Sequence, residues 1–140
     1  MKTKIIYNDE LDKKYKQHII KELDNEAMRK RNIRADTGSF SFVMLDEEGE
    51  FVGGMQGYNY YGCCHIDLLY IREDRRKHGH GSELLKQAEK LARKRNCTFM
   101  TVSTMDFQAR PFYEKHGFRL EFTRRGYENN SLLFILRKEL

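Results

Sequence analysis

The sequence predicts a mixed α/β fold in which a twisted central sheet is flanked by helices. Apolar and polar residues alternate at 39–44 and 118–122, which is typical of half-buried strands. At 11–27 and 84–92 apolar residues recur every three or four positions, which is typical of amphipathic helices. The chain has 140 residues, of which 39% are hydrophobic, so one domain covering residues 1–140 is expected.

The first half of the chain predicts a strand, a helical region and a hairpin. Residues 2–7 are assigned to the first strand, and residues 9–31 to one or two helices. A strand at 39–44 leads into the turn at 46–49 and returns as a strand at 51–58. Gly53, Gly54 and Gly57 interrupt this returning strand, which indicates a bulge or the close approach of another group.

The second half predicts a strand–helix–strand crossover followed by a helix and two strands. A strand at 63–72 precedes a helix at 82–95 and a strand at 98–103. A short helix at 108–116 accommodates Pro111 only in its first turn, and Gly117 is a fitting stop. Strands at 118–122 and 132–137 end the chain, so the sheet is antiparallel in its first half and contains one crossover.

Composition excludes several classes of protein. No apolar run is long enough to span a bilayer, and residues 1–6 lack the pattern of a secretory leader, so a cytoplasmic protein is expected. Cys63, Cys64 and Cys97 form an odd set, which favours reduced, buried thiols. No second pair of ligands completes a metal site, so no metal is expected. The net charge of +5 suits an anionic ligand or a nucleic acid.

A basic, glycine-containing loop at 76–81 is the most informative segment. It reads Arg-Lys-His-Gly-His-Gly and lies between an apolar strand and a helix. Glycine lets the backbone approach a ligand, and the free N–H groups of a helix N-terminus attract anions. A dinucleotide-binding loop requires a third glycine where Leu84 stands, and the Gly-Lys-Ser/Thr of a Walker loop is absent. The loop therefore predicts a phosphate site of another type.

Two motifs together resemble the GNAT superfamily of acyl-CoA-dependent N-acetyltransferases. The pattern Arg76-x-x-Gly79-x-Gly81 resembles the pyrophosphate loop of this family. The segment at 109–118, Ala-x-x-Phe-Tyr-x-Lys-x-Gly-Phe, resembles the second motif of the family, and the interval between the motifs fits. One position departs from the family, which often has Asn where this chain has Asp106. An acid there repels phosphates, so its side chain is expected to face away or to cap backbone groups.

The resemblance implies a GNAT-type sheet with a splayed cleft between the fourth and fifth predicted strands, holding acetyl-CoA. In the family, the backbone of the strand before the loop binds the pantetheine amides, and its N–H groups can polarise the thioester carbonyl. The residues expected at the cofactor are Leu69, Tyr70, Ile71, Arg76, Lys77, His78, Gly79, His80, Gly81, Ser82, Asp106 and Phe112. His116, the last residue of the short helix predicted at 108–116, is expected to be exposed.

The resemblance also assigns the catalytic candidates. Tyr113 matches the family's general acid, and a tyrosine is protonated at neutral pH, so it can protonate the departing thiolate. His65 and Asp67 lie two apart on one predicted strand and so share a face. Either residue can act as the base for the amine, or the two can simply satisfy each other beside the core.

The acceptor is expected to be a primary amine of a small molecule. A protein or peptide acceptor, a basic nucleic-acid-binding module and a CoA sensor without turnover remain alternatives. The basic clusters at 13–21, 29–34 and 93–95 are interspersed with acids and match no nucleic-acid-binding motif, so neither a nucleic acid nor a membrane is expected as a partner. The aromatic segment 58–61 can line the acceptor pocket or form the surface of a homodimer.

Overall fold

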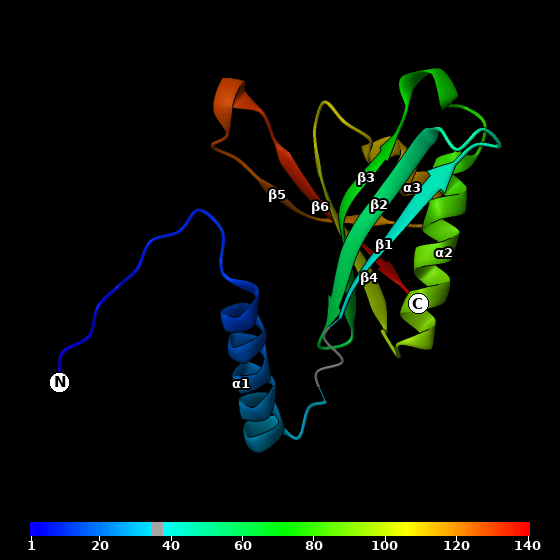
Figure 1. The fold of residues 1–140 in the computed structure, drawn as a ribbon. Coiled ribbons are helices and arrows are strands. Elements are labelled where there is room, and N and C mark those ends of the chain that lie inside the picture. Colours follow the sequence, from blue (N-terminus) through cyan, green and yellow to red (C-terminus); the bar gives the residue numbers. More distant parts are fainter. Residues whose placement is uncertain (35–37) are drawn as a thin grey trace. The chain divides into compact units, whose positions relative to one another are not determined.

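The computed structural model describes residues 1–34 and 38–140, which fall into two compact units that divide between residues 35 and 36 (Figure 1). The first unit contains helix α1 (Lys13–Arg31). The helix begins at Asp12, whose carboxylate accepts a hydrogen bond from the Lys14 N–H at 2.9 Å. It ends at Asn32, which adopts the left-handed conformation with φ of 52°. One helix therefore accounts for the helical region expected at 9–31.

The strand predicted at 2–7 is wrong. This segment has no regular secondary structure. A strand is stable only when another strand satisfies its backbone hydrogen bonds, and the described residues of the first unit contain no strand to pair with it. Six residues with two adjacent isoleucines therefore do not suffice to specify a strand.

The second unit is built on a mixed sheet flanked by helices, as the sequence predicted, and this sheet has six strands. Its strand order is β1-β2-β3-β4-β6-β5, and only β3 and β4 are parallel neighbours. The strands are β1 (Gly38–Leu45), β2 (Phe51–Tyr60), β3 (Cys63–Ile71), β4 (Phe99–Met105), β5 (Arg119–Arg124) and β6 (Leu133–Glu139). Helix α2 (His80–Lys94) makes the crossover from β3 to β4, and α3 (Arg110–Lys115) follows β4. Two short 3-10 turns, η1 (Glu73–Arg75) and η2 (Glu128–Asn130), complete the unit.

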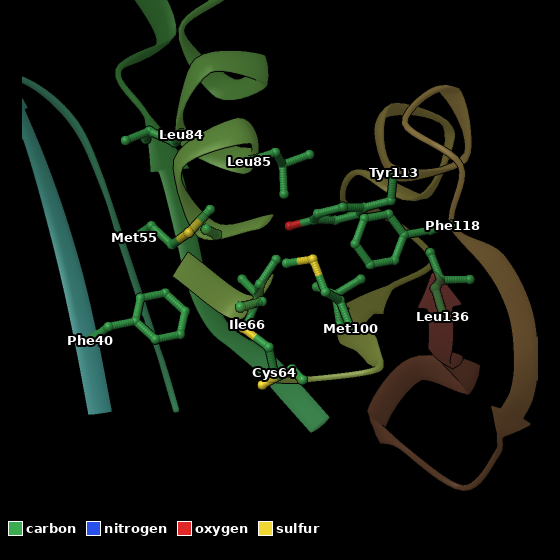
Figure 2. Packing of buried hydrophobic residues seen from close by; sticks show 14 residues of the cluster. Phe40, Met55, Cys64, Ile66, Leu84, Leu85, Met100, Tyr113, Phe118 and Leu136 are labelled. Carbon is green, nitrogen blue, oxygen red and sulfur yellow. The ribbon is translucent and has the colours of Figure 1, made fainter. Parts of the chain in front are cut away.

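The core lies between α2, α3 and one face of the sheet. Leu84, Leu85, Ala88 and Ala92 of α2 are buried, in agreement with the predicted apolar face of this helix. Figure 2 shows the α2 leucines near Met55, Ile66 and Met100 of the sheet, with Tyr113, Phe118 and Leu136 completing the cluster. Burial of these side chains holds the N-terminus of α2 in a fixed place at the end of β3.

A β-bulge in β3 lies next to the point where this strand stops pairing with β4. Gly57 pairs with Ile66 and Gln56 pairs with Leu68, so Asp67 is the extra residue. A Cβ on Gly57 would collide with the His65 carbonyl oxygen and the ring of Phe40, so the close approach that the sequence predicted is confirmed.

Two further expectations concern the cysteines and the membrane. All three cysteines are buried free thiols, as expected. Among the helices in the described parts of the chain, none is long and apolar enough to cross a bilayer.

Candidate active site

The site begins where β3 and β4 part. The two strands pair from Cys63 with Phe99 to Ile66 with Val102, yet β3 continues to Ile71 and β4 to Met105. Beyond this point the edge of β3 that faces β4 has no ladder partner in β4, and its backbone groups are open to a ligand. A cleft of about 850 Å³ opens here, bounded by β3, the loop before α2, the first turn of α2, and α3.

The loop at 76–82 forms one end of this cleft. Gly79 precedes α2 with φ of 83°, and Lys77 also adopts a positive φ of 66°. No side chain caps α2, so the first-turn N–H groups of His80, Gly81 and Ser82 are those that a helix leaves without an intrahelical partner. These groups and the helix dipole favour a negative charge at this end of the cleft.

Two contacts fix the loop against its surroundings. The Arg76 Nε donates a hydrogen bond to the Ile71 carbonyl at 2.9 Å, and its guanidinium lies 5.5 Å from the centre of the Tyr70 ring. A Cβ on Gly81 would lie 3.0 Å from the Cζ of Phe112, so glycine permits α2 and α3 to approach each other. Gly81 thus serves packing between helices as well as access to the backbone.

Most of the residues expected at the site line this one cleft. They are Asp67, Leu69, Tyr70, Ile71, Arg76, Lys77, Gly79, His80, Gly81, Ser82, Phe112 and Tyr113. His65, His78 and Asp106 are outside this lining. The exposed side chain of Asp106 lies in the turn after β4, where its N–H donates to the Leu132 carbonyl at 2.9 Å. The cleft is lined instead by its neighbours Phe107 and Gln108, which the sequence analysis did not select.

Tyr113 lies at the wall of the cleft with its ring in the core. It is 5% exposed, and its ring packs edge-on against Phe112 at 5.2 Å. It also packs edge-on against Phe118 at 5.7 Å, and Figure 2 shows these two rings side by side. Burial raises the pKa of Tyr113 to about 12, so the phenol keeps its proton across the physiological range. Within the described part of the chain, no group hydrogen-bonds its hydroxyl, which leaves that proton available to a ligand in the cleft.

His65 and Asp67 lie on the face of the sheet opposite α2. The His65 Nδ1 is 2.7 Å from the Thr101 hydroxyl oxygen, and its ring lies 5.3 Å from that of Tyr58. Burial lowers the pKa of His65, and the negative charge of Asp67 opposes this shift. The Asp67 carboxylate accepts a hydrogen bond from the Gln56 side chain at 3.1 Å. Only Asp67 of this pair reaches the cleft, because the bulge places it where β3 leaves β4.

A contact that the sequence patterns did not predict joins the two motifs. The expectation that His116 is exposed is wrong, because this residue is half-buried. Its Nε2 lies 2.8 Å from the Ser82 hydroxyl oxygen and its Nδ1 lies 2.8 Å from the Phe112 carbonyl oxygen. The imidazole thus connects the end of α3 to the first turn of α2.

Comparisons with known proteins identify the family of this chain. Residues 4–118 match the family model of the acetyltransferase (GNAT) family. Over 95 residues the chain is 38% identical to the blasticidin-S acetyltransferase of Streptomyces morookaense, which covers 67% of this chain and 70% of that protein. Over 84 residues it is 31% identical to an acetyltransferase of Agrobacterium fabrum, which covers 60% of this chain and 61% of that protein.

Solved structures show the same fold. An acetyltransferase from Bacillus cereus superimposes with a TM-score of 0.77 and 26% identity, over 96% of this chain and 98% of that chain. A GNAT family acetyltransferase from Elizabethkingia anophelis, solved with acetyl-CoA bound, gives a TM-score of 0.63 and 19% identity, over 86% of this chain and 83% of that chain. The second likeness is one of fold alone.

The chain therefore belongs to the GNAT family of acetyltransferases. Acetyl-CoA is its cosubstrate, as the two motifs predicted.

Proposed function

We propose that this chain transfers the acetyl group of acetyl-CoA to a primary amine of a small molecule, by direct attack of the amine on the thioester. The cleft between β3 and β4 carries the proposal, because it joins an anion site at one end to a phenol and a carboxylate. The similarity to a blasticidin-S acetyltransferase supports a small-molecule acceptor. The family match spans both units of the chain, which supports a single domain over residues 1–140.

The residues of the cleft fit this cosubstrate. The first-turn N–H groups of α2, together with Arg76 and Lys77, bind the pyrophosphate. The open edge of β3 at 69–71 hydrogen-bonds the pantetheine amides, which need the alternating donors and acceptors that an unpaired strand offers. A backbone N–H of the same edge stabilises the negative charge that develops on the thioester oxygen.

Tyr113 acts as the general acid. As the amine nitrogen bonds to the thioester carbon, the carbon–sulfur bond breaks, and Tyr113 gives its phenolic proton to the leaving sulfur. Its raised pKa keeps that proton in place until the sulfur takes it. The phenolate then recovers a proton from solvent, which closes the cycle.

Asp67 serves the amine. It lines the cleft, whereas His65 does not, so Asp67 attracts the cationic acceptor and receives its excess proton, directly or through water. His65 is hydrogen-bonded to Thr101 and packs against the ring of Tyr58. The sequence left open which of these two residues is the base, and the lining of the cleft favours Asp67.

Thiol release tests the proposal. Purified protein is incubated with acetyl-CoA and a panel of primary amines that includes blasticidin S, polyamines and aminoglycosides, with lysine-containing peptides as the alternative class. We expect acceptor-dependent release of CoA with a small molecule. Turnover with peptides alone would refute a small-molecule acceptor, and no turnover with any amine would refute the transfer itself.

A further inference from the structure

The hydrogen bonds of His116 determine which of its ring nitrogens carries a hydrogen and where the hydroxyl proton of Ser82 points. A carbonyl oxygen only accepts hydrogen bonds, so the Nδ1 of His116, 2.8 Å from the Phe112 carbonyl, carries a hydrogen. In the neutral imidazole the Nε2 is then an acceptor, and the Ser82 hydroxyl, at 2.8 Å, donates to it. The single hydroxyl proton of Ser82 therefore points at His116 and away from any anion.

Protonation of His116 reverses this arrangement. Both ring nitrogens of an imidazolium are donors, so Nε2 donates to the Ser82 oxygen. The hydroxyl proton of Ser82 is then released for another acceptor. Ser82 is in the first turn of α2 and lines the cleft beside Gly81, so that acceptor is an anion at the helix N-terminus.

We propose that His116 is a positioning residue for the pyrophosphate of acetyl-CoA, which acts through the Ser82 hydroxyl and takes up a proton when the pyrophosphate binds. The inference rests on the proposed function for the place of the cosubstrate. His116 and Ser82 belong to different motifs, 34 residues apart, so protonation in one motif is coupled to pyrophosphate binding in the other.

The charges around His116 favour this coupling. The other titratable and charged side chains that line the cleft are Asp67 and Tyr70 from β3, Arg75, Arg76 and Lys77 from η1 and the loop, His80 from α2, and Tyr113 and Lys115 from α3. Cations predominate in this set, which suits an anionic ligand, and a protonated His116 would add one more positive charge to it. An anion bound among them favours that charge, so occupancy of the site and protonation of His116 support each other.

Calorimetric titration measures the coupling directly. Dephospho-CoA is the cleaner probe, because it keeps the pyrophosphate and lacks the terminal phosphate monoester that itself titrates near neutral pH. Titrations in two buffers of different ionisation enthalpy give the number of protons bound per site. For both acetyl-CoA and dephospho-CoA we expect uptake of up to about one proton above pH 7, and a dissociation constant that rises by up to about tenfold per pH unit.

Three variants assign the proton. His116→Gln offers Ser82 a permanent amide donor, so we expect binding with little proton uptake and a flat pH profile. The hydrogen bond between His116 and Ser82 is called the relay here. Ser82→Ala removes the hydroxyl of this relay and should flatten the pH profile of binding as well. His80→Gln removes the other histidine of the cleft and should retain the uptake. Thermal unfolding of each variant verifies that it folds.

The outcomes are distinct. Binding of both nucleotides without proton uptake, or an undiminished uptake in His116→Gln, would overturn the relay while leaving the proposed function intact. Loss of the uptake in His80→Gln alone would overturn it too, as would uptake with acetyl-CoA but not with dephospho-CoA. A protein that binds neither nucleotide contradicts the proposed function itself, and the relay with it.

Discussion

Replacing Tyr113 by phenylalanine separates catalysis from stability. The ring packs against Phe112 and Phe118, and phenylalanine keeps those contacts. The hydroxyl has no hydrogen-bond partner among the described residues, so its removal should change the free energy of unfolding by less than about 1 kcal/mol. A general acid contributes about 10²–10⁴-fold to a rate. This range corresponds to about 2.7–5.4 kcal/mol of lost transition-state stabilisation.

Three measurements compare the wild-type protein, Tyr113→Phe and a control variant. Thiol release gives kcat, calorimetry gives the dissociation constant of acetyl-CoA, and urea unfolding gives stability. Tyr127→Phe is a matched control, because Tyr127 is an exposed tyrosine outside the cleft. We expect Tyr113→Phe to lose about 10²-fold or more in kcat, with cofactor affinity and stability close to those of the control. Full turnover in Tyr113→Phe would refute the role of this phenol.

Substitutions at three other positions test the loop, the base and the neighbouring histidine. Gly81→Glu should abolish acetyl-CoA binding in calorimetry through charge and bulk, while Gly81→Ala, which meets Phe112 in the same way without the charge, should retain weaker binding; equal loss in both would implicate packing alone. Asp67→Asn should lower kcat with an unchanged dissociation constant for acetyl-CoA, and a normal kcat would exclude Asp67 as the base. Burial lowers the pKa of His65 below its ordinary 6.5, so the stability that its neutral form contributes is complete above pH 6.5 and is lost as the pH falls through the lowered value. Urea unfolding at about pH 5 and pH 7.5 should show a smaller pH effect in His65→Gln, and an equal effect would refute the linkage.

Much of the second unit was predictable because its signals are local. The alternating strands, the apolar face of α2, and Gly117 after α3 each depend on neighbours within a few residues, and each predicted element is present. The glycines of β2 correctly indicated a close approach, because only a missing Cβ admits the His65 carbonyl beside Gly57. The strand predicted at 2–7 is wrong because a strand needs a second strand to pair with, and no local sequence pattern indicates whether one is present.

The two motifs of the site could be predicted from the sequence, but the hydrogen bonds and strand register that bring its residues together could not. The loop and Tyr113 were identified from two short patterns, and both line one cleft. The hydrogen bond from Ser82 to His116 spans 34 residues, and it depends on how α2 and α3 pack across Gly81. Asp67 lines the cleft and His65 does not, and Asp67 is the extra residue of the β-bulge opposite Gly57, which sets the face of every later residue of β3.

A crystal structure of the protein with CoA tests the central claim most directly. We expect the pyrophosphate oxygens to lie about 2.7–3.2 Å from the backbone nitrogens of Gly79, His80, Gly81 or Ser82. The pantetheine should run along the open edge of β3 and bring the sulfur to the Tyr113 hydroxyl. A CoA molecule bound on the other face of the sheet, or with its sulfur remote from Tyr113, would contradict this account of the site.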